Sequence, residues 1–554
     1  MDNNNSNYFI AVGGTGERVA RAVMHLCDCG QFGIGDQFGN NRVKEIKLMI
    51  IDPDEGNGNK KSLNRMLDRY CDCYDWFWDD NCNFFSTKIS KAILDSGDIK
   101  ADWAVSPVKG APGQSANDKP YTLNDYLTNE DVPVATNFMR ALYNREEYEL
   151  KNMKDGFFAH PSIGAHTFAR WLESSPEFQS LLEGIRGGLM HGDVKVFIAG
   201  SAFGGTGASG FPAVAKKIRS FVDQLPGRTN NEVIISGAFF LPYFTFEYRD
   251  IDNNQVDEEG SIKYEHFLKA AKNALSFYDT YKSDRSFNRV YVLGAPSKGG
   301  VVMTRNFYAD KGEGQDNWPH MLELFGALSA KDFFEADDAS FQSEVPDRPY
   351  WYGAGVVKDS FGQLEWKDLP NSQNFERLLN RFLLMSYIYV PAVINHFIEQ
   401  KNGSTVIRSY KEHGKSFEPI ASKPFINGAF IGKDWSDEFR KTGYTRFVGL
   451  NDYFFGHAKW YSQLISGFQR RGYGQVIFKQ LIKGDILQKR AKNEWNTETL
   501  EDDLGLSVIG VDSFKYGSIT PDLNRKISTN QNDVNGAIGV LIRGIYDTVS
   551  KYIR

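Results

Sequence analysis

The sequence has few cysteines, little net charge and no long apolar run. Its 554 residues include five cysteines, Cys27, Cys29, Cys71, Cys73 and Cys82, and an odd count argues against a disulfide framework. The net charge of −6 excludes the global basic field typical of proteins that bind nucleic acids. No stretch approaches the roughly 18 apolar residues of a membrane span. We therefore expect a globular protein with no membrane span and no nucleic-acid partner.

The cysteines and the N-terminus also bear on compartment and metal binding. Residues 1–5 lack the basic and apolar parts of a secretory signal, so we expect a cytoplasmic protein. Four cysteines form two Cys-x-Cys pairs, which are tighter than the spacing of about two to four residues usual in zinc sites. Ordinary buried cysteines are the favoured interpretation, and a zinc site is the alternative.

A glycine-rich turn in the middle of the chain joins a predicted strand, residues 194–200, to a predicted helix that begins near Phe211. The turn contains Gly204, Gly205, Thr206 and Gly207. Glycines let backbone amides approach an anion, and the N-terminus of a helix adds partial positive charge. The turn contains no lysine, so it is not a Walker A motif.

A second glycine turn follows the first predicted strand, residues 8–12, and contains Gly13, Gly14, Thr15 and Gly16. The next predicted strand ends on Asp52. A Rossmann dinucleotide site is the alternative here, but Gly-Gly-Thr-Gly differs from the G-x-G-x-x-G fingerprint. In addition, Asp52 follows Gly16 by 36 residues, where about 20 are usual. A nicotinamide-dependent oxidoreductase would also leave the second turn without a role.

Two phosphate-type turns on distant strands resemble the plan of the tubulin/FtsZ superfamily, with bacterial tubulin-like proteins as the closest group. Residues 203–210 resemble the family's Gly-Gly-Gly-Thr-Gly-Thr/Ser-Gly signature, with Phe203 in place of the first glycine. Residues 160–164 resemble its Asn-Pro-x-x-Gly loop, and residues 238–247 resemble its Pro-Phe-x-x-Glu turn. Residues 273–279 resemble the helix that offers an asparagine to the base. These similarities follow the family's order over roughly residues 8–340.

The resemblance implies GTP or GDP as ligand, together with Mg²⁺. Turn 13–16 would hold the α- and β-phosphates, and turn 204–207 the β- and γ-phosphates. The further implied contacts are Asp52 to Mg²⁺ through water, Gly164 in the loop over the γ-phosphate, Glu247 to the ribose and Asn273 to the base. Two alternatives stay open: Asp52 as the cap of a strand end and Asn273 as an ordinary surface residue.

Catalysis is where the sequence departs from the family. The family hydrolyses GTP when a neighbouring subunit inserts an acidic loop, Gly-x-x-Asn-x-Asp-x-x-Asp, and the chain has no such string. Glu335, Asp337 and Asp338 follow the helix predicted over residues 319–334, where that loop would lie. They are either catalytic acids that act in trans or a solvated acidic turn. The sequence therefore predicts nucleotide binding better than it predicts GTPase activity.

The predicted fold class is α/β. Residues 1–344 are expected to form a tubulin/FtsZ-like domain with a mostly parallel sheet flanked by helices and with insertions around residues 54–158. Residues 345–554 are expected to form a mixed or mainly helical domain that serves as an assembly or partner interface. Its predicted helices include residues 372–400. The expected function is a GTP-binding protein that assembles into oligomers or filaments, with any hydrolysis coupled to assembly. The alternative is a non-hydrolysing nucleotide-bound scaffold or switch that works with protein partners in a bacterial defence or stress system.

Overall fold

The computed structural model divides the chain into two compact units. The first unit contains residues 1–24, 35–65 and 89–358, and the second contains residues 25–34, 66–88 and 359–554. The structure describes residues 5–32, 43–54, 57–78, 82–95, 98–100, 102–103, 122–124, 140–141, 143, 157, 160–225, 232–249, 264–280, 286–294, 301–306, 318–336, 350–355, 372–389, 398–401, 404–407, 449–450, 453–454, 456–461, 463–464, 539, 542–547 and 550–551.

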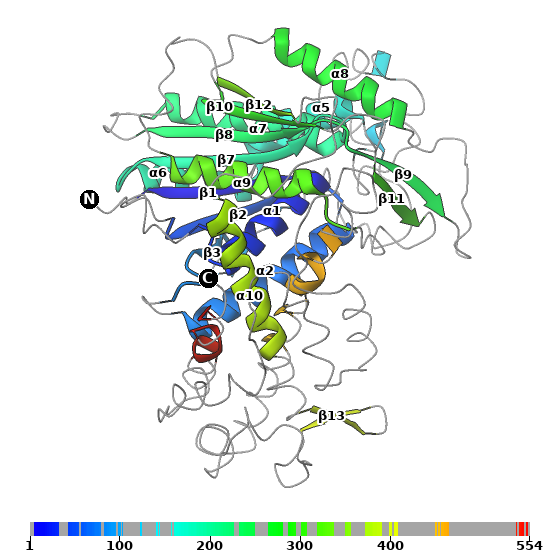
Figure 1. Cartoon of the computed structure of the whole chain (residues 1–554). Helices are drawn as coiled ribbons and strands as arrows, with labels where there is room; N and C mark the ends of the chain where they lie inside the picture. Colours follow the sequence, from blue (N-terminus) through cyan, green and yellow to red (C-terminus); the bar gives the residue numbers. More distant parts are fainter. Residues whose placement is uncertain are drawn as a thin grey trace, which may run out of the picture. The chain divides into compact units, whose positions relative to one another are not determined.

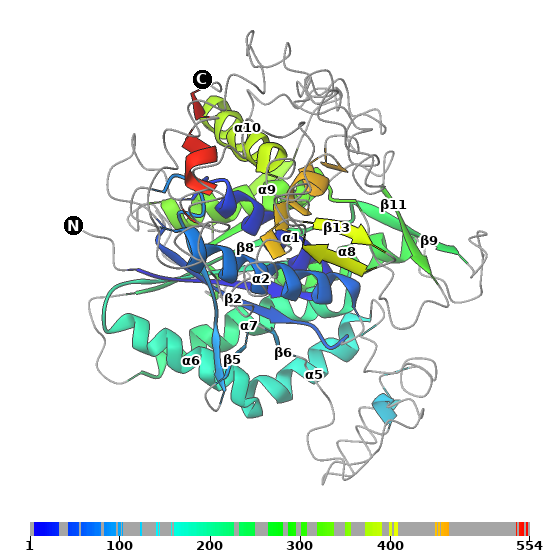
Figure 2. The same cartoon turned by 90° about the horizontal axis from the view of Figure 1, so that it is seen from below.

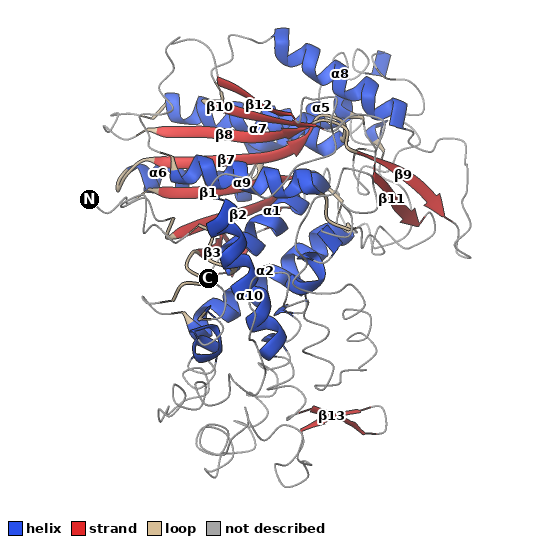
Figure 3. Ribbon diagram, viewed as in Figure 1, coloured by secondary structure: helices blue, strands red, loops and turns tan. Residues whose placement is uncertain are grey.

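The first unit is built on a sheet whose central strands all run parallel (Figures 1 and 3). Six strands are adjacent in the order β12-β10-β8-β7-β1-β2. Their bounds are Tyr350–Gly355, Arg289–Gly294, Val233–Phe240, Val194–Ser201, Ser6–Val12 and Glu45–Ile51. Short strands β3 (Lys88–Lys91) and β6 (Asp102–Trp103) join the sheet beside β2. The strands predicted near residues 8, 46, 194, 232 and 289 are thereby confirmed, as is the α/β class.

Helices cover both faces of this sheet. Figure 2 shows α5 (Pro161–Ser174), α6 (Pro176–Leu189) and α7 (Gly205–Asp223) on one face. Helices α1 (Gly13–Asp28) and α9 (Met321–Glu335) lie on the other face. Every residue of β7 and β8 is buried, as expected for central strands of a parallel sheet covered on both faces.

The order of the strands reverses direction between β1 and β7. From β1 the chain continues outward through β2, whereas from β7 it continues the other way through β8 and β10. In open α/β sheets, ligands bind in the crevice at the carboxyl ends of the strands where the order reverses. Both glycine turns lie at this point, because α1 follows β1 directly and α7 begins four residues after β7 ends.

Smaller elements complete the first unit. Strands β9 (Phe244–Arg249) and β11 (Val301–Asn306) form a parallel pair outside the main sheet, and β4 (Ile93–Asp95) pairs antiparallel with β5 (Asp98–Lys100). Helix α8 (Tyr264–Thr280) precedes β10, and α2 (Gly58–Phe77) begins in the first unit and ends in the second.

The second unit contains α10 (Ser372–Tyr389), a hairpin of β13 (Ile398–Lys401) and β14 (Ser404–Ile407), and helical residues within 449–464 and 542–547. The helix predicted over residues 372–400 is confirmed over Ser372–Tyr389 and wrong at residues 398–400, which belong to β13; residues 390–397 lie outside the described residues. Aromatic side chains such as Phe85, Phe382 and Tyr453 form the core of this unit.

Candidate functional site

The two glycine turns touch each other at the carboxyl ends of β1 and β7. A Cβ atom on Gly13 would lie 3.2 Å from Thr206 Cβ and 3.3 Å from the amide nitrogen of Gly207. Gly13 also has a φ of +68°, which residues with a side chain rarely adopt. Turns that lie some 190 residues apart in the sequence therefore form one structure. We call residues 13–16 and 204–207 together the glycine edge.

The first turn of α7 offers uncapped backbone amides. Gly204 is the N-cap residue in an extended conformation, and no described side chain caps the helix. The amides of Gly205, Thr206 and Gly207 come before the first intrahelical hydrogen bond can form. Unpaired amides at the positive end of a helix are the usual partners of a phosphate or another anion.

Phe203 accounts for the departure from the glycine signature. Its side chain is 1% exposed and packs on the rings of Tyr243, Phe244 and Phe267, at centroid distances of 6.1, 5.2 and 4.9 Å. Phe203 therefore anchors the turn in an aromatic cluster made with β9 and α8. The glycines that follow it allow close packing, because a Cβ on Gly205 would lie 2.6 Å from Phe157 Cβ and one on Gly207 would lie 2.6 Å from the amide nitrogen of Ser201.

A buried pair of carboxyl groups lies beside the glycine edge. Asn57 Nδ2 donates to Glu17 Oε2 at 3.2 Å and to Asp52 Oδ2 at 3.1 Å, and it lies 3.5 Å from the position of a Cβ on Gly14. The amide of Asp54 donates to Asp52 Oδ1 at 2.9 Å. Glu17 Oε1 is buried and has no hydrogen-bond partner among the described residues. The pair therefore keeps an unused acceptor next to the first glycine turn.

Burial is the main influence on the protonation of this pair. It raises the pKa of Glu17 well above its usual value, and the charge of Asp52 raises it further. Burial also raises the pKa of Asp52, although the Asp54 amide and the charge of Lys60 oppose this rise. Both pKa values are therefore raised, and that of Glu17 lies well above its usual value.

A buried ion pair supports the same edge from the α9 side. Arg18 Nε lies 2.6 Å from Glu323 Oε1, which also accepts from Tyr243 Oη at 2.9 Å. Arg18 donates to the backbone oxygen of Trp318 at 2.6 Å. His320 caps α9, since its ring accepts from the amide of Leu322 at 3.1 Å. These contacts fix the start of α1 against the start of α9.

Gly164 occupies a different setting from the predicted one. The loop predicted at residues 160–164 is the start of helix α5, which begins at Pro161. Proline suits the first position of a helix, because its missing amide hydrogen has no partner there in any case. A Cβ on Gly164 would lie 2.2 Å from Ser209 Oγ of α7. The residue thus allows two helices to pack closely, which corrects the expectation of a loop.

The remaining predicted nucleotide contacts do not converge on the glycine edge. Glu247 lies in β9, where it pairs with Thr304 of β11, outside the main sheet. Asn273 is an exposed residue of α8. No described contact connects either residue to residues 13–16 or 204–207. Their roles toward ribose and base stay predictions.

Glu335 lies at the opposite edge of the sheet. Lys195, the second residue of β7, donates to the backbone oxygens of Phe334 at 3.3 Å and Ala336 at 2.6 Å, which places the end of α9 at the amino end of β7. The carboxylate of Glu335 forms an ion pair with Lys331. Asp337 and Asp338 lie outside the described residues. Within one chain, Glu335 therefore lies away from the glycine edge.

The amides of the glycine edge and the carboxyl groups beside it fit a phosphate chain with a hard divalent cation. Unpaired helix amides suit phosphate oxygens, while Asp52 and the unused oxygen of Glu17 are the oxygen ligands that Mg²⁺ prefers. Sequence reasoning found Asp52 but missed Glu17 and Asn57. A signal for Glu17 was available, because it directly follows Gly16 in the first turn of a predicted helix.

Comparisons with known proteins leave the family open. The chain gives no significant match to any protein-family model or to any curated protein. The parallel sheet and its switch point between β1 and β7 are compatible with a Rossmann-like nucleotide-binding domain. Among the described residues, no helix combines the length and the apolar character that crossing a membrane requires.

Proposed function

We propose that the first unit binds a nucleoside triphosphate through the glycine edge, with GTP and Mg²⁺ as the ligands. The single observation that carries the proposal is the contact of Gly13 with Thr206 and Gly207 at the switch point of the sheet. Two helix starts that meet there supply two sets of backbone amides for one run of phosphates. A dinucleotide fold of the Rossmann type needs only one such set.

The proposed division of roles follows the contacts. The amides of residues 13–16 and 204–207 hold phosphate oxygens, and the charged carboxylate of Asp52 holds Mg²⁺ through water. Glu17 lies beside Asp52, and burial raises its pKa, so a bound cation would favour its ionised form. The preference for guanine comes from the resemblance to the tubulin/FtsZ superfamily, as does the assembly proposed next.

We further propose that the chain assembles into oligomers or filaments and that any hydrolysis depends on assembly. Glu335 lies at the amino edge of the sheet, so its carboxylate can meet a phosphate chain at the carboxyl edge only across two subunits. Catalysis would then consist of positioning and charge stabilisation by an acid supplied in trans.

A nucleotide-bound scaffold without turnover is the second candidate, and one observation favours it. Glu335 is already paired with Lys331 in its own helix, which reduces its availability as a catalytic group. Such a scaffold would act with partner proteins, for example in a bacterial defence or stress system.

GTP turnover measured against protein concentration, with sedimentation in parallel, tests both candidates. Turnover per subunit that rises with concentration and follows the pelleted fraction supports assembly-coupled hydrolysis. Tight GTP binding with flat, near-zero turnover supports the scaffold. Absence of GTP binding overturns both.

A further inference from the structure

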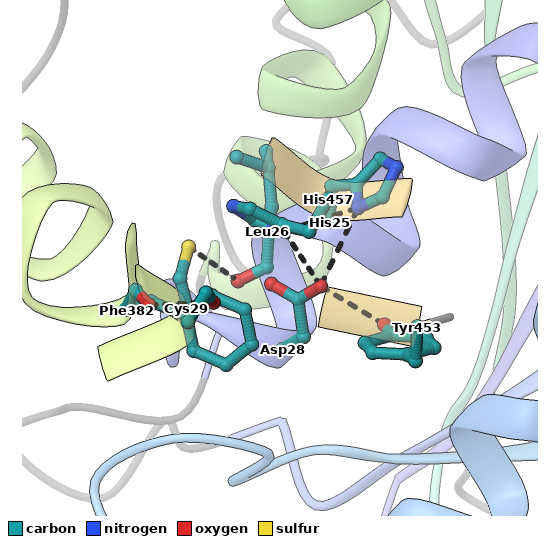
Figure 4. Close-up of polar contacts among 8 residues, drawn as sticks. His25, Leu26, Asp28, Cys29, Phe382, Tyr453 and His457 are labelled. Carbon is teal, nitrogen blue, oxygen red and sulfur yellow. Dashed lines mark hydrogen bonds and ion pairs between the residues drawn. The ribbon is translucent and has the colours of Figure 1, made fainter. Parts of the chain in front are cut away.

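Three side chains of the second unit point nitrogen and oxygen atoms that can bind a metal at one another (Figure 4). His25 Nδ1 lies 3.1 Å from His457 Nδ1 and 3.4 Å from Asp28 Oδ2, and His457 Nδ1 lies 2.8 Å from the same oxygen. All three side chains are at most 3% exposed. We call these three residues the buried triad.

With Asp28 as a carboxylate, no arrangement of protons on the two imidazoles turns all three contacts of the buried triad into hydrogen bonds. If both Nδ1 atoms carry hydrogen, the two histidines face each other as donors at 3.1 Å. If only His457 Nδ1 carries a hydrogen, His25 Nδ1 and Asp28 Oδ2 are both acceptors and cannot bond each other. If only His25 Nδ1 carries a hydrogen, His457 Nδ1 and the same oxygen are both acceptors. A cation among the three atoms would satisfy every contact at once, because each atom then directs a lone pair toward it.

The helix that carries two of these residues favours a cation at this place. His25 and Asp28 lie in the last turn of α1, where the helix dipole places partial negative charge. The helix ends at Asp28 because Gly30 has a φ of +83°, and its amide donates to the backbone oxygen of Cys27 at 3.1 Å. Histidine and aspartate three residues apart share one face of a helix.

Aromatic packing fixes the orientation of the imidazoles. The His25 ring stacks on Trp460 at a centroid distance of 4.5 Å, and the His457 ring packs against Phe382 at 4.6 Å. Tyr453 Oη donates to Asp28 Oδ2 at 2.9 Å and so orients the carboxylate. Ligands held in this way lose little conformational entropy when a metal binds.

Asp28 also offers a fourth donor. Its Oδ1 atom is buried and has no hydrogen-bond partner among the described residues. A bidentate Asp28 with two histidines would complete a four-coordinate N₂O₂ set, and a set made wholly by protein is typical of structural zinc. Donor atoms around a tetrahedral zinc ion lie roughly 3.3–3.6 Å apart. Of the observed separations, 3.4 Å lies within this range, 3.1 Å lies slightly below it, and 2.8 Å is shorter by about 0.5 Å or more.

We propose that His25, Asp28 and His457 bind one structural Zn²⁺ ion, which ties the end of α1 to the helical segment around residue 457 within the second unit. The site needs no cysteine: Cys29 Sγ instead donates to the backbone oxygen of Leu26 at 3.5 Å. The proposal does not depend on nucleotide binding by the first unit.

Metal content of the full-length, tag-free protein tests the proposal. The chain purified without chelators should contain about one equivalent of zinc. After removal of the metal, Co²⁺ should return about one equivalent, with the visible bands of tetrahedral nitrogen and oxygen ligation and without a thiolate charge-transfer band. Added Zn²⁺ should raise the thermal midpoint of the metal-free protein.

Near-isosteric variants locate the ligands. Asp28→Asn and His457→Gln should each lower zinc affinity by at least about 10-fold to 100-fold. Two controls should keep wild-type content: His191→Gln, which changes an exposed histidine of the first unit, and Cys71→Ser, which removes a thiol outside the triad. If a ligand variant fails to fold, the Co²⁺ spectrum of the wild type still decides the donor set.

Three results would overturn the proposal. The first is a folded wild-type protein that neither contains nor takes up zinc. The second is a thiolate band with Co²⁺, which would assign the metal to the cysteines. The third is unchanged zinc affinity in folded Asp28→Asn and His457→Gln proteins.

Discussion

The glycine edge of the first unit is made of backbone, whereas the buried triad of the second unit is made of side chains. The backbone site is encoded by short contiguous strings, because a turn needs its glycines next to one another in the chain. The side-chain site joins residues separated by up to 432 positions, and only His25 and Asp28 of its three members lie close together in the sequence. A contiguous motif can be recognised in a single sequence, but a site made of residues far apart in the chain can be recognised only in the folded structure.

The largest expected effect comes from placing a single negative charge at the glycine edge. Thr206→Asp places a carboxylate at the edge, where repulsion from a phosphate about 4 Å away costs about 4 kcal/mol at an effective dielectric constant of 20. We expect GTP affinity to fall about a thousandfold. Asparagine has nearly the same shape as aspartate but no charge, so Thr206→Asn serves as the matched control. Equal affinities of the two variants would show that phosphate does not bind there.

The next prediction concerns the buried triad. Tyr453→Phe removes a donor to the buried Asp28 carboxylate, which typically costs about 1–3 kcal/mol of unfolding free energy. A bound cation offsets part of the same charge. We therefore expect the substitution to cost less in zinc-saturated protein than in metal-free protein, as measured by denaturant unfolding. Equal costs in both forms would contradict a metal at the triad.

A third prediction tests the contact between the two glycine turns. Gly13→Ala places a side chain at a φ of +68°, which costs roughly 1–2 kcal/mol. The added Cβ also presses on Thr206, so GTP affinity should fall together with the unfolding free energy. Gly187→Ala in α6 meets no atom within 4 Å and should instead stabilise the chain by about 0.5–1 kcal/mol. The prediction fails if both alanines shift stability in the same direction.

The smallest expected effect concerns the protonation of Glu17. Its raised folded-state pKa means that its contribution to stability is complete below its usual value of 4.5 and is lost as the pH rises through the folded-state pKa. Glu17→Gln should therefore gain stability over the wild type at neutral pH and lose that advantage in acid. Glu183→Gln, at an exposed position of α6, is the control. If the unfolding free energies of the two variants depend on pH in the same way, the raised pKa of Glu17 is contradicted.

Much of the first unit could be predicted from sequence, for identifiable reasons. The largely apolar runs of β7 and β8 predicted buried parallel strands, and the glycine turns predicted helix starts directly after strands. The contact between Gly13 and Thr206 could not be predicted from local pattern, because it depends on the adjacency of β1 and β7. Gly164 was misjudged because a helix-packing glycine and a loop glycine look alike in one sequence.

The acid pair and the buried triad illustrate the limit of such prediction. Glu17 and Asp52 come from different elements, and Asn57 donates to both. His25 and Asp28 read as ordinary helix residues, and nothing along the chain connects them with His457. Burial and direction of approach decide what these residues can do, and both are properties of the packed chain.

Equilibrium binding of labelled GTP to the full chain in the presence of Mg²⁺, with ATP and NAD as competitors, tests the central claim most directly. We expect one saturable site per chain, displaced by unlabelled GTP, poorly displaced by NAD and lost in Thr206→Asp but not in Thr206→Asn. The absence of saturable binding, or displacement by NAD as effective as by GTP, would contradict it.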